Sequence, residues 1–303
     1  ISIAVHLKDV RQRDSIIIEW SKNGEKNIGI IDCNLYEGRN PTLDYIKRER
    51  ISKIEFIILS HFHFDHFSGM SDIFEYCCLN KISVKYFYHS LAPFLAEIYN
   101  RIFTSQKIQN EVMRCVEKYY SVDNFVIDTI PVNSQTKNLE LLDNTFISFL
   151  APQGRIYNKM AKQLARKRNK ITTTKADVNK LSTIVLIENE TNSILFTSDS
   201  VKKSFKNINV TTELVLVQVP HHASINSIDN IFWKNLKRIP KCPAIFSVGD
   251  EPKDKLPNEE TVRFFDLEDF DVYSTNQVYG INSYFKLGLS TEKNPGTSVA
   301  LNT

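Results

Sequence analysis

A buried strand that runs directly into a cluster of histidines constrains this chain more than any other feature. Residues 55–60 read EFIILS, a continuous apolar run typical of a strand buried on both faces. The next residues, 61–66, read HFHFDH. His61 and His63 point the same way in an extended segment, and the aspartate and the third histidine follow at the turn into the next predicted helix. Three imidazoles and a carboxylate at a strand end predict a divalent-metal site, the alternative being a surface cluster of histidines.

Two later strand ends supply further candidate ligands. Residues 194–198 predict an apolar strand that ends just before Asp199. Residues 214–220 predict another strand, which leads into His221 and His222. Five of the seven histidines thus lie at two strand exits, where side chains from distant segments of the chain can meet.

The two other histidines and the cysteines carry weaker signals. His6 lies within the first predicted strand and is interpreted as structural, whereas His89 ends a strand and is a candidate to line a cleft. The five cysteines are irregularly spaced and form no C-x-x-C pair, which argues against a thiolate zinc site and against a disulfide framework. Reduced thiols of this kind predict a cytoplasmic protein.

The pattern of apolar residues predicts an α/β fold. Strands are predicted at residues 1–7, 14–20, 27–32, 55–60, 84–89, 144–150, 181–187, 194–198, 214–220, 244–248, 272–275 and 283–287. Helices are predicted at residues 67–79, 91–120, 229–237 and 258–267. Strands that cluster at the start of each half, with helices later, predict two packed sheets covered by helices.

The length suits one large α/β domain or two small ones, and the lack of a long polar linker favours one. The chain has 303 residues, of which 42% are hydrophobic and 24% charged, and these are ordinary globular values. No apolar run approaches the roughly 18–20 residues needed to cross a bilayer, so no membrane association is expected. We expect one domain over residues 1–290, with a helical insert at about 90–120, a basic insert at about 155–180 and a loose tail at 291–303.

The histidine motif resembles the signature of a known family. His61-x-His63-x-Asp65-His66 is similar to the metal-binding motif of the metallo-β-lactamase superfamily, which implies a four-layer αββα sandwich with a metal site at the sheet edges. Over roughly residues 1–288, the chain also resembles the hydrolase domain of the ComEC-type competence DNA-uptake proteins and their free-standing relatives. The segments concerned include DVRQRDS at 9–15 (DVGQGDS in that group), TSD at 197–199 (TGD) and VPHHAS at 219–224 (VPHHGS).

The resemblance implies a role for each candidate residue. The implied metal ligands are His61 and His63 for a first ion, Asp65, His66 and His221 for a second ion, and Asp199 as the bridge between them. The catalytic candidates are Asp65, Asp199 and His222; adjacent residues leaving a strand point opposite ways, so His222 is expected to contact the substrate or support the ligands. Asp32 and Ser224 are expected to orient the ligands from behind.

The chain departs from the family pattern in two respects. Arg11 and Arg13 replace two glycines of the opening segment and become candidate substrate-binding residues, as do His89, Lys167 and Arg168. The predicted strand that ends at residues 150–152 lacks the third histidine that many members supply to the first ion. The expected cofactor is therefore one or two divalent ions, Zn²⁺ before Mn²⁺.

A water molecule activated by the expected metal ion would act as a nucleophile, so the predicted reaction is hydrolysis. The sequence contains no Walker A loop, no dinucleotide fingerprint and no nucleophile elbow. The basic insert holds nine Lys and Arg residues and one acid, which would attract phosphates or, alternatively, form a solvated helix face. The leading hypothesis is a phosphodiesterase or nuclease acting on a nucleic acid or nucleotide phosphodiester.

Two other functions stay open at this point. One is hydrolysis of a small ester, thioester or lactone at the same metal site. The other is a metal-bound module without catalysis in a multi-protein system such as phage defence. A protein partner or a second copy of the chain is a further candidate partner.

Overall fold

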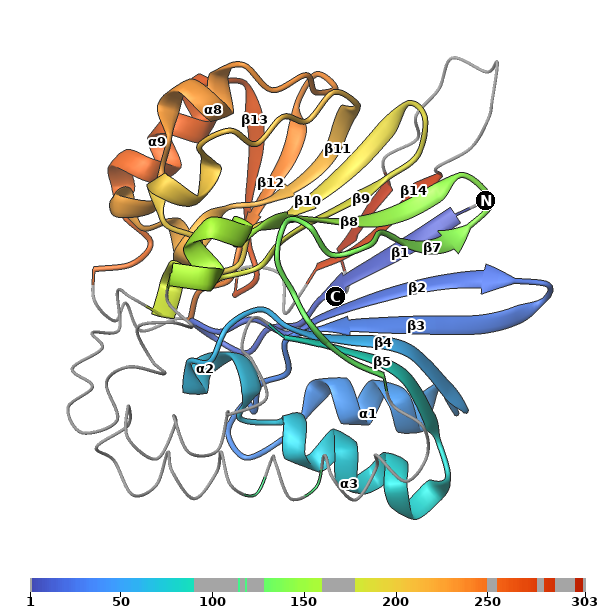
Figure 1. Cartoon of the computed structure of the whole chain (residues 1–303). Coiled ribbons are helices and arrows are strands. Elements are labelled where there is room, and N and C mark those ends of the chain that lie inside the picture. Colours follow the sequence, from blue (N-terminus) through green and yellow to red (C-terminus); the bar gives the residue numbers. More distant parts are fainter. Residues whose placement is uncertain are drawn as a thin grey trace.

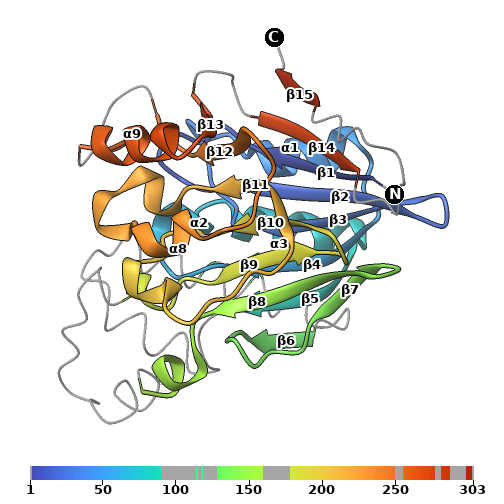
Figure 2. The same cartoon turned by 90° about the horizontal axis from the view of Figure 1, so that it is seen from above.

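Two β-sheets face each other across the main hydrophobic core, and helices cover their outer faces (Figure 1, Figure 2). This is a computed structural model, which describes residues 2–89, 114, 118, 128–159, 178–249, 255–276, 281–286 and 298–301. One side carries α1 (Pro41–Arg48), α2 (Phe64–Phe67) and α3 (Met70–Asn80), and the other carries α8 (Asn230–Lys234) and α9 (Glu259–Leu267) (Figure 1). The layers confirm the predicted αββα sandwich.

The first sheet combines an antiparallel half with a parallel half. Its strands are β1 (Ser2–Leu7), β2 (Ile16–Lys22), β3 (Glu25–Ile31), β4 (Lys53–Leu59), β5 (Ser83–His89), β6 (Asp128–Pro131), β14 (Ile281–Lys286) and β15 (Ser298–Leu301). They lie in the order β15-β14-β1-β2-β3-β4-β5-β6, and the pairs from β3 to β6 are parallel. Asn23 and Gly24 both have positive φ between β2 and β3, as a two-residue hairpin turn requires.

The second sheet has the same mixture of directions. Its strands are β7 (Leu139–Leu142), β8 (Thr145–Ala151), β9 (Ile184–Glu188), β10 (Asn192–Phe196), β11 (Glu213–Gln218), β12 (Cys242–Phe246) and β13 (Phe270–Ser274). They lie in the order β13-β12-β11-β10-β9-β8-β7, with parallel pairs from β10 to β13. Three short 3-10 helices follow β10 and β11: η1 (Lys202–Phe205), η2 (Pro220–Ala223) and η3 (Ile225–Ser227). The parallel strands carry the segments that follow them to a common edge.

Residues 56–59 of strand β4 are all apolar because both faces of this part of the strand are buried. Phe56 and Ile58 belong to the core between the sheets, whereas Ile57 and Leu59 belong to the core under α1 and α3. All four side chains have no exposed surface. This alternation fixes the face to which each residue points, and therefore the direction in which the histidine segment leaves the strand.

The structure confirms the predicted strands, and the helices predicted at 229–237 and 258–267, to within a few residues, but it corrects the helix predicted at 67–79. The helix predicted from residue 67 begins at Met70, because Gly69 separates it from the short helix α2. Helix α1 was not predicted, although Asn40 caps it by accepting a hydrogen bond from the Leu43 amide at 3.1 Å and Pro41 occupies its first turn. Strands β6, β7 and β15 were not predicted either; β15 forms where the sequence predicts a loose tail.

Most of the two predicted inserts lies outside the described residues. This holds for Lys167 and Arg168 and for residues 90–120 apart from two helical positions, Arg114 and Lys118. These two side chains form ion pairs with Asp72 at 2.7 Å and Glu75 at 2.9 Å on α3. The single-domain boundary at residue 290 and the role of the basic insert stay predictions.

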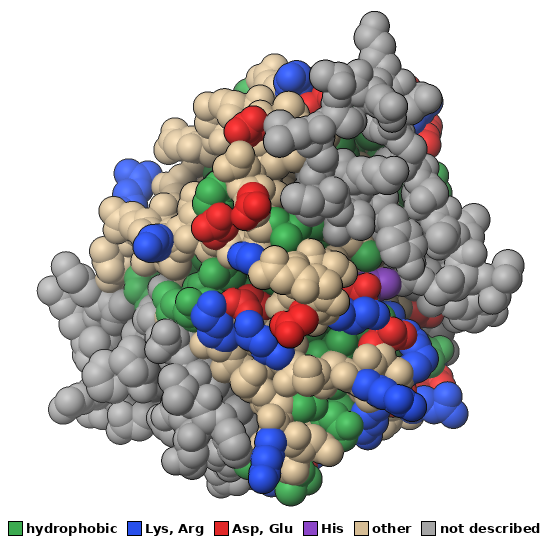
Figure 3. Space-filling model, turned by 90° about the vertical axis from the view of Figure 1, so that its right-hand side faces the viewer, with side chains coloured by type: hydrophobic (Ala, Val, Ile, Leu, Met, Phe, Trp, Pro, Cys, Tyr) green, Lys and Arg blue, Asp and Glu red, His purple; other side chains and the backbone are tan. Residues whose placement is uncertain are grey.

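Charges of both signs are interleaved at the end of the molecule that carries the β2–β3 turn (Figure 3). Lys26, for example, lies 3.4 Å from Glu19 and 2.9 Å from Glu49, and Lys85 lies 2.6 Å from Glu55. The described residues of this face therefore form no patch of a single sign that would attract a polyanion. Within the described residues, no helix combines the length and the apolar character that a membrane span requires.

Lys8 is a half-buried cation next to α1. Its ammonium lies 4.9 Å from the centre of the Tyr45 ring. Burial, reinforced by the charge of Arg48, lowers the pKa of Lys8 from 10.5 to about 8. The protonated lysine therefore costs stability below pH 8, and this cost disappears as the pH rises from 8 to 10.5.

We expect Lys8→Met to stabilise the fold at neutral pH. The free energy of unfolding should rise by about 2 kcal/mol at pH 7, after allowance for the lost cation–π contact. The gain should shrink toward zero as the pH approaches 10.5, where the lysine is half-neutral even in the unfolded chain. Urea denaturation of both proteins at several pH values measures this difference. A gain that does not change with pH would show that the lysine charge is not its origin.

Candidate metal centre

Three chain segments bring histidines and aspartates to one edge of the sandwich. The segment after β4 carries residues 61–66, the loop after β10 carries Asp199, and η2 after β11 carries His221 and His222. The last two segments turn sharply, with φ of 47° at Ser198, 50° at His221 and 52° at His222. Non-glycine residues in this left-handed region carry strain, a common feature of functional sites.

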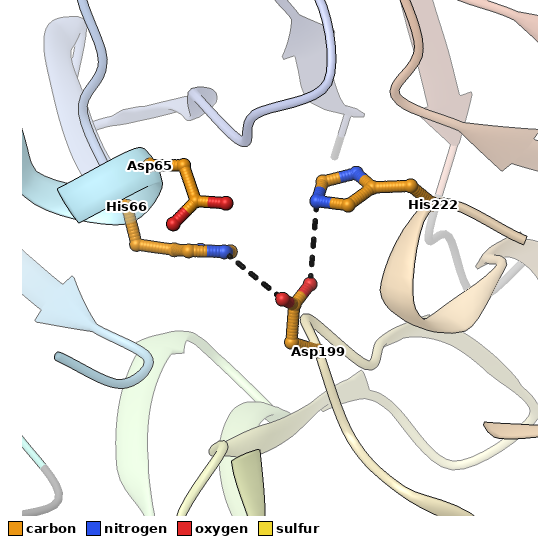
Figure 4. Close-up of side chains that lie close together, drawn as sticks. All are labelled: Asp65, His66, Asp199 and His222. Atoms are coloured by element: carbon orange, nitrogen blue, oxygen red, sulfur yellow. Dashed lines mark ion pairs between the residues drawn. The ribbon is translucent and has the colours of Figure 1, made fainter. Parts of the chain in front are cut away.

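Four of these side chains form one compact set, which we call the Asp65 group: Asp65, His66, Asp199 and His222. Their ligand atoms all lie within 4.8 Å of one another. The Asp199 carboxylate lies between the two imidazoles, 3.5 Å from His66 Nε2 and 3.4 Å from His222 Nε2 (Figure 4). Asp65 is half-buried and the other three are buried, so the set opens on the side of Asp65.

A second set shares Asp199 and is called here the His61 group: His61, His63 and Asp199. Its ligand atoms also lie within 4.8 Å of one another. His61 Nε2 lies 3.0 Å from His63 Nδ1 and 3.7 Å from the Asp199 carboxylate. Because Asp199 belongs to both groups, the structure places it where the sequence predicts a bridging carboxylate.

The structure exchanges the predicted places of two neighbouring histidines. The sequence analysis puts His221 with Asp65 and His66 and turns His222 away, whereas the structure brings His222 into the Asp65 group. The reason is that both residues adopt left-handed backbone, so the alternation of an extended strand does not apply to them. His221 keeps a contact of 3.6 Å with Asp199, but its side chain is 27% exposed and its Nδ1 lies 3.2 Å from the Ser227 hydroxyl.

Several polar atoms at the centre of the site are buried without a hydrogen bond. They are His63 Nε2, His66 Nε2, His222 Nε2 and Asp199 Oδ1. Buried polar atoms normally find partners, and such a concentration needs an explanation. A divalent cation accepts lone pairs from imidazole nitrogens and carboxylate oxygens, so the donor set fits a metal.

The hydrogen bonds of the other ring nitrogens orient two imidazoles for this role. His66 Nδ1 donates to Asp32 at 2.7 Å, and His222 Nδ1 donates to the Ser247 carbonyl at 2.9 Å. A neutral imidazole that donates through Nδ1 carries its lone pair on Nε2, the atom that faces Asp199 in both residues. Asp32 therefore lies where the sequence analysis expects an orienting carboxylate.

Burial and charge set the protonation of the site. Burial lowers the pKa of His61 well below 6.5 and also lowers that of His63, so both are neutral near pH 7. Burial acts in the same direction on His66, but the Asp32 and Asp199 carboxylates outweigh it and raise its pKa. Burial would raise the pKa of Asp199, but the surrounding imidazoles, His222 first, hold it well below 3.8.

Serine hydroxyls connect His61 to the same orienting carboxylate. Ser60 donates to Asp32 at 2.6 Å, and Ser198 donates to Ser60 at 2.7 Å. His61 Nδ1 lies 3.2 Å from the Ser60 hydroxyl and 3.4 Å from that of Ser198. Ser198, which stands where the family pattern has glycine, thus adds an oxygen that can accept from His61. The sequence analysis quotes this position within the segment TSD at 197–199 and assigns it no role.

The structure gives different surroundings to Ser224, which was predicted to support the ligands, and to His89, which was predicted to contact the substrate. Ser224 shapes the turn through its backbone, which donates to the His221 carbonyl at 2.9 Å. His89 is buried against Phe87 and Phe62, at ring distances of 5.3 and 6.2 Å, and its contact with a substrate stays a prediction.

The two arginines of the opening segment also differ. Arg11 forms an ion pair of 2.5 Å with Glu37, so its charge is compensated. Arg13 instead donates to the Leu35 carbonyl at 3.1 Å and lies 6.0 Å from the centre of the Phe64 ring. Phe64 stands between His63 and Asp65, so Arg13 adjoins the segment that carries the ligands.

The sequence analysis identified only part of a third group, which consists of two carboxylates and one imidazole. Asp14, Asp32 and His66 have ligand atoms within 4.8 Å of one another. All three side chains already form hydrogen bonds, since Asp14 accepts from Ser247 and Asp32 accepts from Ser60 and His66. We therefore interpret this group as support for the metal centre. Asp14 lies in the quoted segment DVRQRDS, but no spacing rule links it to His66 or Ser247.

Comparison with known proteins agrees with this architecture. Residues 9–137 match the family model described as the metallo-beta-lactamase superfamily, whereas a search of curated protein sequences finds no match. The structure is similar to the metallo-beta-lactamase fold protein YhfI from Bacillus subtilis, with a TM-score of 0.52 and 10% identity over 94% of this chain and 100% of that one. An identity this low shows a shared fold alone.

Two other solved structures have lower scores. Zinc-bound PqqB from Methylobacterium extorquens has a TM-score of 0.48 and 8% identity over 90% of this chain and 98% of that one. A diphosphatase of the PhnP family has a TM-score of 0.45 and 14% identity over 91% of this chain and 95% of that one. Residues 9–137, less than half of the chain, are thus similar to the metallo-β-lactamase superfamily, and the sandwich architecture agrees with the fold of that superfamily.

Proposed function

We propose that the chain is a hydrolase that depends on two divalent metal ions and cleaves phosphodiester bonds, as a phosphodiesterase or a nuclease. The observation that carries the proposal is the convergence of the Asp65 group and the His61 group on a shared Asp199. The buried nitrogens and oxygen without hydrogen bonds at this point support it.

The charge of the site favours two ions over one. Four carboxylates gather here, those of Asp14, Asp32, Asp65 and Asp199. Within the described part of the chain, no lysine or arginine forms an ion pair with any of them. Burying several like charges is costly unless cations compensate them. Two divalent ions would carry four positive charges, which equals the four carboxylate charges.

The residues present suit the chemistry of metal-assisted hydrolysis. Divalent ions in such a site lower the pKa of a water molecule and neutralise negative charge that develops on the substrate. Asp65 is the half-buried member of its group, so its carboxylate can hold the attacking water and take a proton from it. His221, partly exposed beside Asp199, can contact the substrate or donate a proton to the leaving group.

Arg13 supports an anionic substrate. In the described residues, its guanidinium pairs with no carboxylate, and a single carbonyl accepts one of its five N–H groups. It lies against Phe64, beside the opening on the side of Asp65. A planar guanidinium at this position suits bidentate binding of a phosphate.

We expect Arg13→Ala to weaken substrate binding much more than Arg11→Ala. The two residues share one loop, but Glu37 compensates only Arg11. The KM for bis(p-nitrophenyl) phosphate should rise about 10-fold in Arg13→Ala, the scale of one charge-assisted hydrogen bond. It should change by less than about 2-fold in Arg11→Ala, as expected for an exposed ion pair. Equal KM values for both variants would contradict a substrate role for Arg13.

A substrate panel tests the reaction class. Purified protein loaded with Zn²⁺ or Mn²⁺ should cleave bis(p-nitrophenyl) phosphate and single-stranded DNA, and a chelator should abolish the cleavage. Hydrolysis of esters, thioesters or lactones without phosphodiester cleavage would favour the small-ester alternative. Bound metal without hydrolysis of any substrate would favour a binding module.

The remaining expectations depend on this proposal. We propose ComEC-type hydrolase domains as the nearest functional analogue, because the segments at 9–15, 197–199 and 219–224 resemble that group. A nucleic acid or a nucleotide is the proposed partner, with the basic insert at about 155–180 as a candidate contact. A cytoplasmic location stays a prediction from the cysteine usage.

A further inference from the structure

Asp14 is a buried carboxylate that has no role in the proposed reaction. It lies in the loop between β1 and β2 and is 2% exposed. A carboxylate this deeply buried normally needs a cation or several hydrogen bonds. The described residues provide no lysine or arginine for it, and its nearest ring nitrogen, His66 Nδ1, lies 3.9 Å away.

The side chain of Asp14 reaches toward both imidazoles of the Asp65 group. One carboxylate oxygen faces His66 Nδ1, at 3.9 Å. The other accepts a hydrogen bond from the Ser247 hydroxyl at 2.7 Å. The carbonyl of the same serine accepts from His222 Nδ1 at 2.9 Å. Asp14 is therefore one contact from His66 and two contacts from His222.

The backbone of Asp14 adds a link to the third member of the group. The Asn34 side-chain amide donates to the Asp14 carbonyl at 2.6 Å and also to the Asp65 carbonyl. Asn34 is fixed in turn, because its oxygen accepts from the Ser68 hydroxyl at 2.8 Å. The bonds of Asn34 with Asp14 and Ser68 are buried, so they hold their geometry better than surface contacts do, and the bond with Asp65 is partly buried.

These links join the two halves of the sandwich. Asp65 and His66 follow β4 of the first sheet, whereas His222 and Ser247 follow β11 and β12 of the second. Asp14 and Ser247 are 233 positions apart in the chain. The spacing of His66 and His222 depends on how the sheets sit relative to each other, and the bond between Asp14 and Ser247 fixes that placement next to the ligands.

A purely structural link would not need a charge here. Asp14 and Asp32 have carboxylate oxygens within 4.8 Å of each other, and two buried like charges repel. An asparagine could accept the same bond from Ser247 without this repulsion. A nearby cation would explain the negative charge of Asp14. The carboxylate would hold the ligands of this cation in place and add to the negative potential that attracts it.

We propose that Asp14 is a positioning residue that holds His66, His222 and Asp65 in the geometry required for the divalent ion of the Asp65 group. This inference rests on the proposed metal-dependent function. It assigns to Asp14 and its partner Ser247 no contact with the substrate or with the reacting atoms.

Titration of the metal-free full-length protein with Mn²⁺ or Zn²⁺ by calorimetry tests the proposal. In Asp14→Asn and in Ser247→Ala, one of the two ions should bind about 10- to 100-fold more weakly, the range for lost outer partners of metal ligands. The other ion, in the His61 group, should keep its affinity within about 3-fold, because the Asp14 side chain contacts Ser247 and His66 and, within the described residues, forms no hydrogen bond or ion pair with His61 or His63.

Ser15→Ala is the matched control. Ser15 follows Asp14 in the same loop, is buried, and its hydroxyl bonds that of Thr42 at 2.7 Å without a link to the site. This variant should lower the melting temperature and leave both metal affinities unchanged. Asp14→Asn should show the opposite pattern, with a melting temperature of the metal-free protein at or above that of the wild type because the repulsion with Asp32 is gone.

The possible outcomes distinguish a failure of the positioning role of Asp14 from a failure of the proposed metal-dependent function. Wild-type affinities in Asp14→Asn and Ser247→Ala, with two ions bound, would overturn the positioning role and leave the metal site intact. An equal loss of affinity in Ser15→Ala would overturn it as well, since general destabilisation would then suffice. A wild-type protein that binds no ion would instead overturn the proposed function together with this inference.

Discussion

Asp199→Asn should lose both metal ions and nearly all hydrolytic activity. Asp199 is the residue shared by the Asp65 group and the His61 group, so one substitution affects both. Asparagine keeps the volume but replaces one carboxylate oxygen by an amide that cannot bind a cation. We expect both affinities to fall by more than the roughly 100-fold upper range for outer partners of metal ligands. Phosphodiesterase turnover should fall by at least about 100-fold, the scale of one lost electrostatic stabiliser.

Elemental analysis after dialysis and the rate of bis(p-nitrophenyl) phosphate cleavage measure these losses. The control is Asp229→Asn, which makes the same chemical change at the cap of α8, where Asp229 accepts from the Ile231 and Phe232 amides. Asparagine caps helices as well as aspartate does, so fold and metal content should be retained. Full metal content in Asp199→Asn would contradict its place at the centre of the site.

His222→Ala and His221→Ala should differ by at least an order of magnitude in their effect on metal binding. His222 is buried, its Nε2 has no hydrogen bond and its ring is oriented by the Ser247 carbonyl. Its loss should weaken one ion by about 100-fold or more. His221 is partly exposed beside Asp199, so its loss should weaken metal binding by less than about 10-fold and act mainly on the reaction rate.

This comparison is internally matched. Both histidines have left-handed backbone, with φ of 50° and 52°, so alanine brings a similar backbone penalty at either position. Calorimetric metal titration of the two variants therefore compares the side chains alone. A large loss in His221→Ala together with a small one in His222→Ala would restore the assignment that the sequence favours.

Sequence reasoning succeeded where the signal is local. The apolar run of β4 reflects burial on both faces, and a histidine motif at its end needs no distant information to be interpreted. The same holds for β10 and β11, whose ends deliver Asp199 and the histidine pair. The helix caps were weaker signals, and α1 was missed although Asn40 and Pro41 mark its start.

The finer organisation of the site depends on contacts that the sequence does not encode locally. Which of two adjacent histidines enters the Asp65 group follows from the backbone angles of η2, and no alternation rule applies in a left-handed turn. The partnership of Asp14 with Ser247 joins opposite halves of the chain. Only a tertiary structure can bring out such a contact, because no local pattern in the sequence links Asp14 to Ser247.

The most direct test of the account is the number and position of divalent ions in the refolded or dialysed protein after loading with Mn²⁺. Anomalous diffraction at the manganese edge would locate them. The account predicts two ions, one among Asp65, His66, Asp199 and His222 and one among His61, His63 and Asp199. A single ion would contradict the two-ion arrangement, and a loaded crystal without any ion at these residues would contradict the account as a whole.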